Sequence, residues 1–505
     1  MSDRPDISTV GELRSSGHTF RTLRTEIREN LLAALSAGEN PWPGLHGFSR
    51  TVLPQVERAL LAGHDIALLG ERGQGKTRLL RTLAALLDEW APVIEGSELG
   101  EHPFDPITDA SRARAAELGD DLPIVWRHRD ERYVEKLATP DTSVADLIGD
   151  VDPMRVAEGR RLGDPETIHY GLVPRSHRGI VAINELPDLA ERIQVSLLNV
   201  MEERDVQIRG YVLRLPLDVL VVATANPEDY TNRGRIITPL KDRFGAEIRT
   251  HYPIELDDEI AIITQEAHLG ADVPPAVLEI LSRFARNLRE SSAVDQSSGV
   301  SARFAIAGAE TVAAAALHRA TVRGEDRAVA RVVDVRTAVD VLGGKVEFEV
   351  GEEGREDELL EHVLRTATAE TVRAHLAGID LGPLVAAIEA ADEVVTTGEQ
   401  VTAAEFLASL PEIPGRADGG QAGDDESAGD DGRSSDGGES AGDGSSGDRT
   451  TGDDETAGDV YDQVAARLGA TDDGSRASAV ELALEGLFLA RRISKETGDG
   501  ETVYG

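Results

Sequence analysis

One stretch, Gly-Glu-Arg-Gly-Gln-Gly-Lys-Thr at positions 70–77, constrains the fold of this chain more than any other. It fits the pattern G-x-x-x-x-G-K-[ST] at every fixed position. Apolar residues 66–69 precede it as a short buried strand, and residues 78–90 follow it as a helix with leucines along one side. This order predicts a loop whose backbone N–H groups wrap a polyphosphate, assisted by the positive end of the helix dipole.

The loop also carries side chains with separate expected roles. Lys76 is expected to reach the β- and γ-phosphates, and Thr77 to ligate Mg²⁺. Gly47 and Phe48, which come just before a helix expected over residues 49–62, either border an adenine base or simply pack. The expected phosphate-binding residues are Gly70, Glu71, Arg72, Gly73, Gln74, Gly75, Lys76 and Thr77.

A second buried strand, residues 179–183, ends in Asn184 and Glu185. An apolar strand ending in two acids is the usual Walker B form, in which the first acid is normally Asp. Glu185 stands where a general base would polarise an attacking water. Asn184 can hold a magnesium-bound water through its amide oxygen, but without a charge. Alternatively, the two residues merely cap the following helix.

A third buried strand, residues 219–224, leads to Asn226, whose amide can orient the lytic water at the strand tip. A basic cluster follows in residues 231–244. It is either a solvated surface or, as we favour, the source of a cation aimed at a neighbour's γ-phosphate. The cluster comprises Arg233, Arg235, Lys241 and Arg243.

The remaining patterns are mostly helical. Residues 188–204 predict a helix, and 205–215 a β-hairpin that turns at Gly210 and either projects into a pore or packs on its own domain. Arg303 opens a later helix and is placed to fold back onto the nucleotide from a lid, unless it simply faces solvent. Further helices are expected at 10–38, 256–269, 274–289, 301–318, 328–342, 356–369 and 384–391.

These patterns divide the chain into six parts, in keeping with a length of 505 residues. The expected parts are a helical lead-in (1–45), an αβα core (46–250), a helical lid (251–345), an acidic helical extension (346–415), a disordered acidic linker (416–459) and a C-terminal helical segment (460–505). That last segment docks either on a partner or on the chain's own core.

The composition excludes several classes of protein. There is no cysteine, which excludes disulfides and thiolate metal sites, and the scattered histidines lack ligand spacing. No apolar run reaches the ~18 residues of a membrane helix, and the polar N-terminus is no signal peptide. We therefore expect a cytoplasmic protein without a membrane partner.

The charge balance is strongly acidic, with a net charge of −40 and only five lysines. Residues 416–459 hold 14 acidic and three basic residues, a net of −11, which leaves −29 for the rest. One interpretation is adaptation to a high-salt, halophilic cytoplasm; the other is a GC-rich genome with an acidic tail. Either way, a negative surface argues against general affinity for nucleic acid.

Taken together, these motifs resemble those of an AAA+ ATPase. Within that class the chain is most similar to the magnesium chelatase I subunit and its MoxR-like relatives, over about residues 40–345. The features that carry the resemblance are HRGIVAINELPDL at 177–189, the helix and hairpin at 190–215, and LKDRFG at 240–245.

The resemblance implies an α/β fold: a P-loop AAA+ αβα core with a parallel sheet, an all-helical lid, and a partly disordered acidic C-terminal extension. It implies that residues 70–77 bind ATP with Mg²⁺ and that Asn184 and Glu185 form Walker B. Asn226 would be sensor 1, Arg243 the finger presented to the adjacent subunit, and Arg303 sensor 2. Members of the family form hexameric rings and work with a von Willebrand A (VWA) domain partner; in chelatase the motor drives Mg²⁺ insertion into protoporphyrin.

Two departures from the family shape the hypotheses. Asn184 replaces the expected Asp, and residues 346–505 lie beyond the minimal chelatase motor. The leading hypothesis is a ring ATPase that remodels a protein partner of unassigned identity. The alternatives are a nucleotide-gated scaffold with little hydrolysis and a DNA-remodelling AAA+ protein, which the negative charge opposes.

Overall fold

The computed structural model describes residues 3–152, 154, 157, 167–203, 206–208, 211–213, 215–226, 234–295, 299–413, 459–498 and 500–505. The chain forms two compact units. Unit 1 comprises Met1–Ala267, Ala285–Ala307 and Gly344–Glu356, and unit 2 comprises His268–Phe284, Gly308–Gly343 and Asp357–Gly505.

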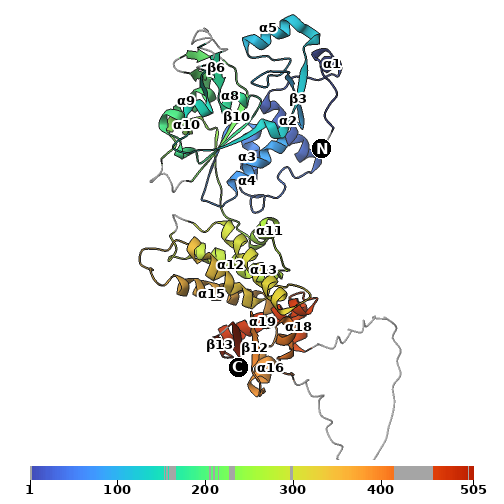
Figure 1. Ribbon diagram of the computed structural model, residues 1–505, viewed down its shortest axis with the longest axis vertical. Coiled ribbons are helices and arrows are strands. Elements are labelled where there is room, and N and C mark those ends of the chain that lie inside the picture. The colour runs from blue at the N-terminus through green and yellow to red at the C-terminus, as the bar shows by residue number, and fades with distance from the viewer. Residues whose placement is uncertain are drawn as a thin grey trace, which may run out of the picture. The chain divides into compact units, whose positions relative to one another are not determined.

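Unit 1 is built on a five-stranded sheet with the strand order β11-β1-β10-β7-β4 (Figure 1). Every neighbouring pair runs parallel, so the carboxyl ends of all five strands meet at one edge of the sheet. The strands are β1 (Ile66–Leu69), β4 (Tyr133–Leu137), β7 (Gly179–Asn184), β10 (Val219–Ala225) and β11 (Ala246–Arg249). The predicted parallel α/β core is thereby confirmed.

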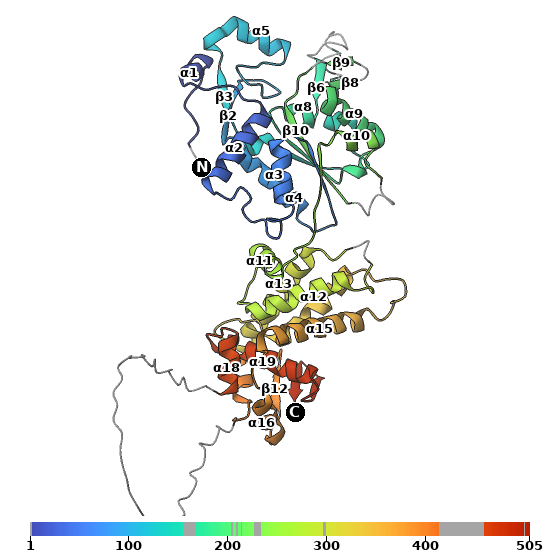
Figure 2. The ribbon, with the colours of Figure 1, turned by 180° about the vertical axis from the view of Figure 1, so that it is seen from behind.

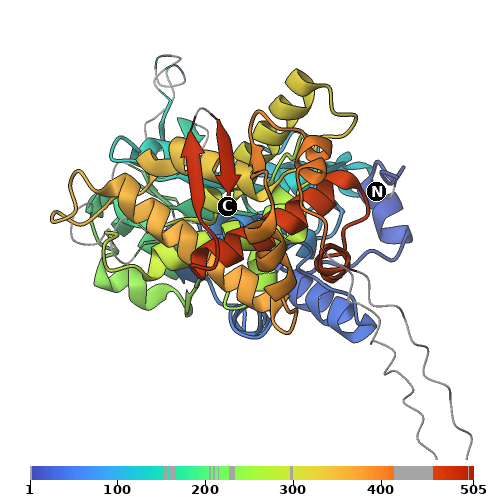
Figure 3. The same ribbon diagram turned by 90° about the horizontal axis from the view of Figure 1, so that it is seen from below.

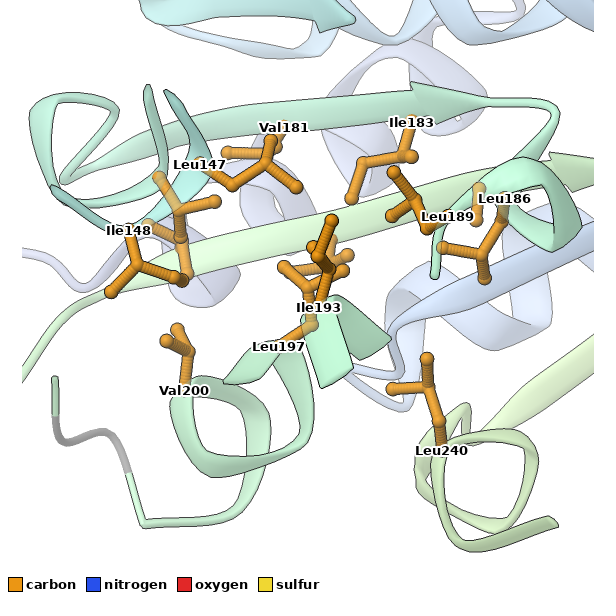
Figure 4. Close-up of a cluster of buried hydrophobic side chains, with 14 of the residues drawn as sticks. Leu147, Ile148, Val181, Ile183, Leu186, Leu189, Ile193, Leu197, Val200 and Leu240 are labelled. Atoms are coloured by element: carbon orange, nitrogen blue, oxygen red, sulfur yellow. The ribbon is translucent and has the colours of Figure 1, made fainter. Parts of the chain in front are cut away.

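Helices cover both faces of this sheet, which explains why its central strands are almost entirely apolar. On β7, Ile180 and Ala182 pack with α2 (Leu23–Ala37), α3 (Leu53–Leu61) and α4 (Lys76–Thr82). Val181 and Ile183 face the other way, toward α9 (Glu191–Glu203) and α10 (Thr238–Arg243), as Figure 4 shows. The two groups of helices can be followed on either side of the sheet in Figure 2.

Small elements decorate the rest of unit 1. One two-stranded antiparallel sheet pairs β2 (Trp90–Ile94) with β3 (Ile124–His128), and another pairs β5 (Gly149–Val151) with β6 (Ile168–Tyr170). The hairpin predicted at 205–215 is confirmed as β8 (Val206–Ile208) and β9 (Tyr211–Leu213), although Gly210 lies outside the described residues. The short helices are α1 (Val10–Ser15), α5 (Asp109–Leu118), α6 (Val144–Leu147) and α8 (Leu172–Arg175).

The predicted helix over residues 78–90 is wrong at its end. Helix α4 stops at Thr82, a 3₁₀ turn follows at Leu83–Leu86, and Trp90 opens β2. Trp90 pairs with His128, a partner 38 residues further along the chain. A local 3.6-residue pattern cannot reveal pairing with a strand so far along the chain. The spacing of the leucines therefore predicts a helix that continues past its true end.

The expected helices beyond the core are present as α11 (Leu256–Glu266), α12 (Pro275–Glu290) and α13 (Ala302–Arg323). The single helix predicted at 328–342 is instead a 3₁₀ turn, Val332–Val335, followed by α14 (Arg336–Leu342). Among the described residues, no helix combines the length and apolar character that crossing a bilayer requires.

Unit 2 joins the C-terminal helices to a small sheet that was not predicted. Its antiparallel strands lie in the order β12 (Val395–Gly398), β14 (Glu501–Tyr504), β13 (Lys495–Gly498), and Figure 3 shows the last two as paired arrows. One apolar cluster unites Phe406, Leu484 and Tyr504, so the C-terminal segment packs on its own chain. The other helices of this part are α15 (Glu356–Leu376), α16 (Gly382–Ala390), α17 (Ala403–Ala408), α18 (Val460–Arg467) and α19 (Asp473–Leu489). The predicted disorder of residues 416–459 falls outside the described residues, except for Asp459, which caps α18.

Candidate active site

The carboxyl edge of the parallel sheet brings the main sequence-predicted residues together. The phosphate-binding loop follows β1, Glu185 follows β7 and Asn226 follows β10. The backbone N–H of Gly70 donates to the carbonyl oxygen of Ala225 at 3.1 Å, so the loop begins directly beside Asn226. Asn226 is buried, and Glu185 is half-buried. A ligand site at this edge is the general expectation for open α/β sheets.

Glycines give the phosphate-binding loop its shape. Gly73 and Gly75 have φ angles of 77° and 76°, in the left-handed region that strains other residues. A Cβ atom on Gly70 would lie 2.0 Å from Oγ1 of Thr250 and 2.2 Å from Oε1 of Gln74. The left-handed backbone at Gly73 and Gly75, and the close approach of Thr250 and Gln74 at Gly70, therefore exclude a side chain at these positions.

The loop is closed by its own side chains. Lys76 is buried, and its Nζ donates to the carbonyl oxygens of Gly70 and of Glu71, the second at 2.6 Å. Oε1 of Gln74 accepts hydrogen bonds from the Glu71 N–H at 3.1 Å and from Oγ1 of Thr250 at 2.7 Å. Thr77, half-buried, is the second residue of α4.

Residues around the start of α13 lie against the same loop. A Cβ atom on Gly73 would lie only 2.2 Å from Cβ of Ser301, which immediately precedes α13. Arg303 is the second residue of that helix and is exposed. The fold thus brings the predicted sensor 2 arginine to within two residues of a contact with the phosphate-binding loop.

Tyr252 and Arg289 hold this arrangement together, although nothing in the sequence marked either of them. The Tyr252 hydroxyl donates to the carbonyl oxygen of Arg72 at 2.7 Å. The Arg289 guanidinium lies 4.4 Å from the centre of the Tyr252 ring, and its Nε donates to the carbonyl oxygen of Val300 at 2.7 Å. A lone Tyr and a lone Arg have no spacing pattern that would have identified them.

The Walker B position is part of a polar chain across three strands. Nδ2 of buried Asn184 donates to Oε1 of Glu135 on β4 at 2.8 Å. Oγ1 of Thr224 donates to Oδ1 of Asn184 at 3.2 Å and accepts from the N–H of Glu185 at 3.1 Å. Glu185 itself has a φ of 54°, a conformation that this bond helps to hold.

The carboxylate of Glu135, which the sequence pattern does not single out, is held by Arg81. The Arg81 side chain donates two hydrogen bonds to its carboxylate, from Nε at 2.8 Å and from Nη2 at 3.1 Å. These bonds hold the pKa of Glu135 below its usual value, against the opposing effect of partial burial. An isolated acid inside the short strand 133–137 gave no signal that it would meet Asn184.

Two members of the predicted basic cluster, Lys241 and Arg243, form ion pairs with acidic residues of their own chain. Arg243 ends α10 and forms an ion pair with Glu202 of α9, with both side chains about 40% exposed (42% and 38%). Lys241 pairs with Glu247 at 2.9 Å. Arg235 is exposed, and Arg233 lies outside the described residues. The finger role of Arg243 stays a prediction.

The oxygen donors at the sheet edge fit a magnesium–nucleotide complex. Mg²⁺ bound to a nucleotide takes phosphate oxygens, waters and only one or two protein oxygens. Thr77, Asn184 and Glu135 supply a hydroxyl, an amide and a carboxylate oxygen, all hard ligands. The part of the chain that the structure describes has no cluster of three or more His, Asp or Glu residues able to hold a metal alone.

These features define the class of the protein. In a parallel αβα core, a phosphate-binding loop follows β1 and an Asn-Glu pair stands at the end of β7. A buried Asn follows β10, which lies between β1 and β7 in the sheet. This is the arrangement of a P-loop nucleotide-binding protein of the AAA+ type.

Comparison with known proteins agrees with this class. The Sigma-54 interaction domain family matches residues 162–243. The magnesium-chelatase subunit ChlI of Anabaena variabilis is 27% identical over 220 residues, which is 42% of this chain and 60% of the relative. The magnesium-chelatase 38 kDa subunit of Cereibacter sphaeroides is 28% identical over 219 residues, 41% of this chain and 57% of the relative. The chain thus spans less than two thirds of the length of either relative, and it is an AAA+ protein that resembles the magnesium chelatase I subunit.

Solved structures were also found to be similar. A complex between subunits BchI and BchD of magnesium chelatase gives a TM-score of 0.33 at 21% identity, covering 63% of this chain and 98% of that chain. The Holliday junction branch migration motor RuvB of Thermotoga maritima gives a TM-score of 0.33 at 14% identity, covering 77% and 85%.

Proposed function

We propose that this chain binds ATP with Mg²⁺ and hydrolyses it to remodel a protein partner. The observation that carries the proposal is the meeting of three elements at one sheet edge: the phosphate-binding loop, Glu185 and Asn226. The resemblance to magnesium-chelatase subunits supports ATP as the nucleotide. The client of the motor is unassigned, because residues 346–505 exceed the minimal chelatase motor.

The residues of the chain would divide the chemistry as follows. Lys76, now bound to two carbonyl groups of its own loop, exchanges these for phosphate oxygens when the nucleotide enters. Glu185 polarises the attacking water as a general base, and Asn226 orients that water. Thr77 and Asn184 would hold Mg²⁺, which would neutralise phosphate charge when bound. Arg303 approaches the nucleotide from the start of α13.

We also propose that the active unit is a ring, in keeping with a hexamer, that engages a VWA-domain protein. Both relatives are named as subunits of magnesium chelatase, which supports work within an assembly. In the ring, Arg243 would stabilise the charge on the transferring phosphoryl group of a neighbouring subunit, a contribution commonly worth ~10³–10⁵ in rate. The acidic composition, with a net charge of −40, suits a halophilic cytoplasm.

Two substitutions test the proposed function. Lys76→Ala should abolish binding of a fluorescent ATP analogue, because the loop loses its cation. Glu185→Gln should bind the analogue normally and release no phosphate above background. Lys345→Ala, which removes an exposed lysine outside the site, is the matched control for the first variant. Phosphate release by Glu185→Gln at the wild-type rate would refute the assignment of the base.

A nucleotide-gated scaffold with little hydrolysis is the second candidate, favoured by the neutral Asn184, whose amide nitrogen and oxygen both form hydrogen bonds within the protein. Steady phosphate release by the wild-type chain in Mg²⁺ would exclude it. Restoring the acid by Asn184→Asp alone is a poor test, because the new carboxylate would face Glu135 at a 2.8 Å contact. Glu135→Gln must therefore accompany it.

A further inference from the structure

We infer that Glu135 supplies the negative charge that the Walker B position of this chain lacks. The inference rests on the proposed function, since it concerns the same magnesium–nucleotide site. Its starting point is the 2.8 Å hydrogen bond between Nδ2 of Asn184 and Oε1 of Glu135. Position 184 lacks the usual acid, but the Asn184 side chain that replaces it is in direct contact with the carboxylate of Glu135.

The register of the sheet places Glu135 on the side of the phosphate-binding loop. On the parallel strands β4 and β7, Glu135 lies opposite Ala182, and Leu137 lies opposite Asn184. Ala182 belongs to the apolar cluster beneath α4. Because paired residues of adjacent strands point to the same face, Glu135 points toward α4.

Helix α4 provides the second half of the arrangement. Thr77 and Arg81 are four residues apart, so they lie on the same side of the helix, one turn from each other. Arg81 donates hydrogen bonds to both carboxylate oxygens of Glu135. The carboxylate is thereby held on the flank of α4 that also carries the predicted magnesium ligand Thr77.

The carboxylate can respond to a cation at this place. Its two oxygens offer about four acceptor positions, and they receive four hydrogen bonds: two from Arg81, one from Asn184 and a longer one, at 3.3 Å, from the Tyr133 hydroxyl. Arg81 is 65% exposed, so its ion pair with Glu135 is screened by water and contributes little to stability. A divalent ion beside the nucleotide can therefore draw on the charge of Glu135, either by displacing one of these bonds or through a bound water.

The test measures magnesium dependence and does not use catalysis. Binding of a non-hydrolysable fluorescent ATP analogue is titrated with Mg²⁺ for the wild-type chain and for Glu135→Gln, which keeps the size of the side chain. We expect the Mg²⁺ concentration for half-maximal binding to rise ~10–100-fold in the variant, the usual cost of losing a group that supports a metal site.

Placing the negative charge at position 184 instead of position 135 should restore magnesium-dependent binding. In Glu135→Gln/Asn184→Asp, the hydrogen bond between the two side chains is retained with donor and acceptor exchanged, and one negative charge returns. The magnesium requirement should come back close to the wild-type value. A magnesium requirement in the double variant as high as in Glu135→Gln would contradict the inference.

Arg81→Gln separates a charge role from simple anchoring of α4. If Glu135 acts through its charge, removal of the competing guanidinium should lower the magnesium requirement or leave it unchanged. If Glu135 merely anchors Arg81, Arg81→Gln should raise the requirement as Glu135→Gln does, and the inference falls. This comparison also holds if Glu135→Gln proves poorly folded.

The sheet itself offers a matched control in Glu247. Like Glu135, it lies two residues before the end of an edge strand and forms an ion pair, in this case with Lys241 at 2.9 Å. Glu247→Gln should leave the magnesium titration unchanged. If the wild-type chain shows no magnesium-dependent binding, the proposed function fails. If the wild-type chain binds in a magnesium-dependent way and the Glu135→Gln titration curve is the same as the wild-type curve, only the inference about Glu135 fails.

Discussion

At the scale of single residues, two buried histidines couple the stability of unit 1 to pH. Nδ1 of His177 accepts the N–H of Asp218 at 3.1 Å, and Nδ1 of His102 accepts the N–H of Phe104 at 3.0 Å. Burial, reinforced by the positive charge of Arg178, lowers the pKa of His177 to about 3 and that of His102 to about 2. Both imidazoles are therefore neutral in the folded chain at pH 7.

The sign of the resulting pH dependence follows from these pKa values. Below pH ~6.5 the unfolded histidines bind protons, whereas the folded ones do not until pH falls to about 3 or 2. The free energy of unfolding should thus decrease by up to ~1.4 kcal/mol per pH unit for each histidine as the pH falls through this window.

A single substitution isolates this contribution. His177→Asn keeps an acceptor for the Asp218 N–H but cannot be protonated, so the variant should lose less stability than wild type between pH 7 and pH 4. Urea unfolding at several pH values measures the difference, and His64→Asn, at an exposed histidine, is the control. Parallel pH profiles for His177→Asn and wild type would show that position 177 has no such role.

At the scale of elements, the phosphate-binding loop and the segment before α13 depend on each other at Gly73. A methyl group there would lie 2.2 Å from Cβ and 2.8 Å from Cα of Ser301, on a backbone with φ of 77°. Gly73→Ala should therefore cost ~1–3 kcal/mol of unfolding free energy and separate the loop from residues 299–303.

Two measurements check the Gly73 prediction. Urea unfolding reports the loss of stability. The affinity for an ATP analogue should also fall, because the phosphate-binding loop and Arg303 would no longer lie close to each other. Gly344→Ala is the control, since among the described residues nothing beyond its immediate chain neighbours lies within 4 Å of the position its Cβ would take. If Gly73→Ala were as stable as this control, the close approach to Ser301 would be wrong.

The elements around the site differ in whether local sequence patterns can predict them. The loop, Glu185 and Asn226 were predicted because each directly follows an apolar strand, and the parallel sheet then brings the strand ends together. Glu135 and Tyr252 were not, because their partners Asn184 and Arg72 lie 49 and 180 residues away. The sheet of β12 to β14 was missed for the same reason, since β12 pairs with a strand more than 100 residues later.

At the scale of the whole molecule, the ion pair between Arg243 and Glu202 bears on the proposed ring. Both side chains are partly exposed, and such surface pairs are typically worth ~0–1 kcal/mol. Assembly can therefore release Arg243 from Glu202 at little cost and present it to a neighbour. A head-to-tail ring has this geometry, because each interface joins two different faces of the same chain.

Mixing two inactive variants tests whether Arg243 acts between subunits. Arg243→Ala should bind ATP without hydrolysing it, because its site receives no finger, and Glu185→Gln lacks the base but keeps the finger. In an equal mixture that exchanges subunits, about a quarter of the interfaces combine an intact Glu185 with an intact Arg243. Phosphate release should then recover to a corresponding fraction of the wild-type rate. If Arg243 served only its own subunit, every site in the mixture would lack one of the two groups, and mixing would restore nothing.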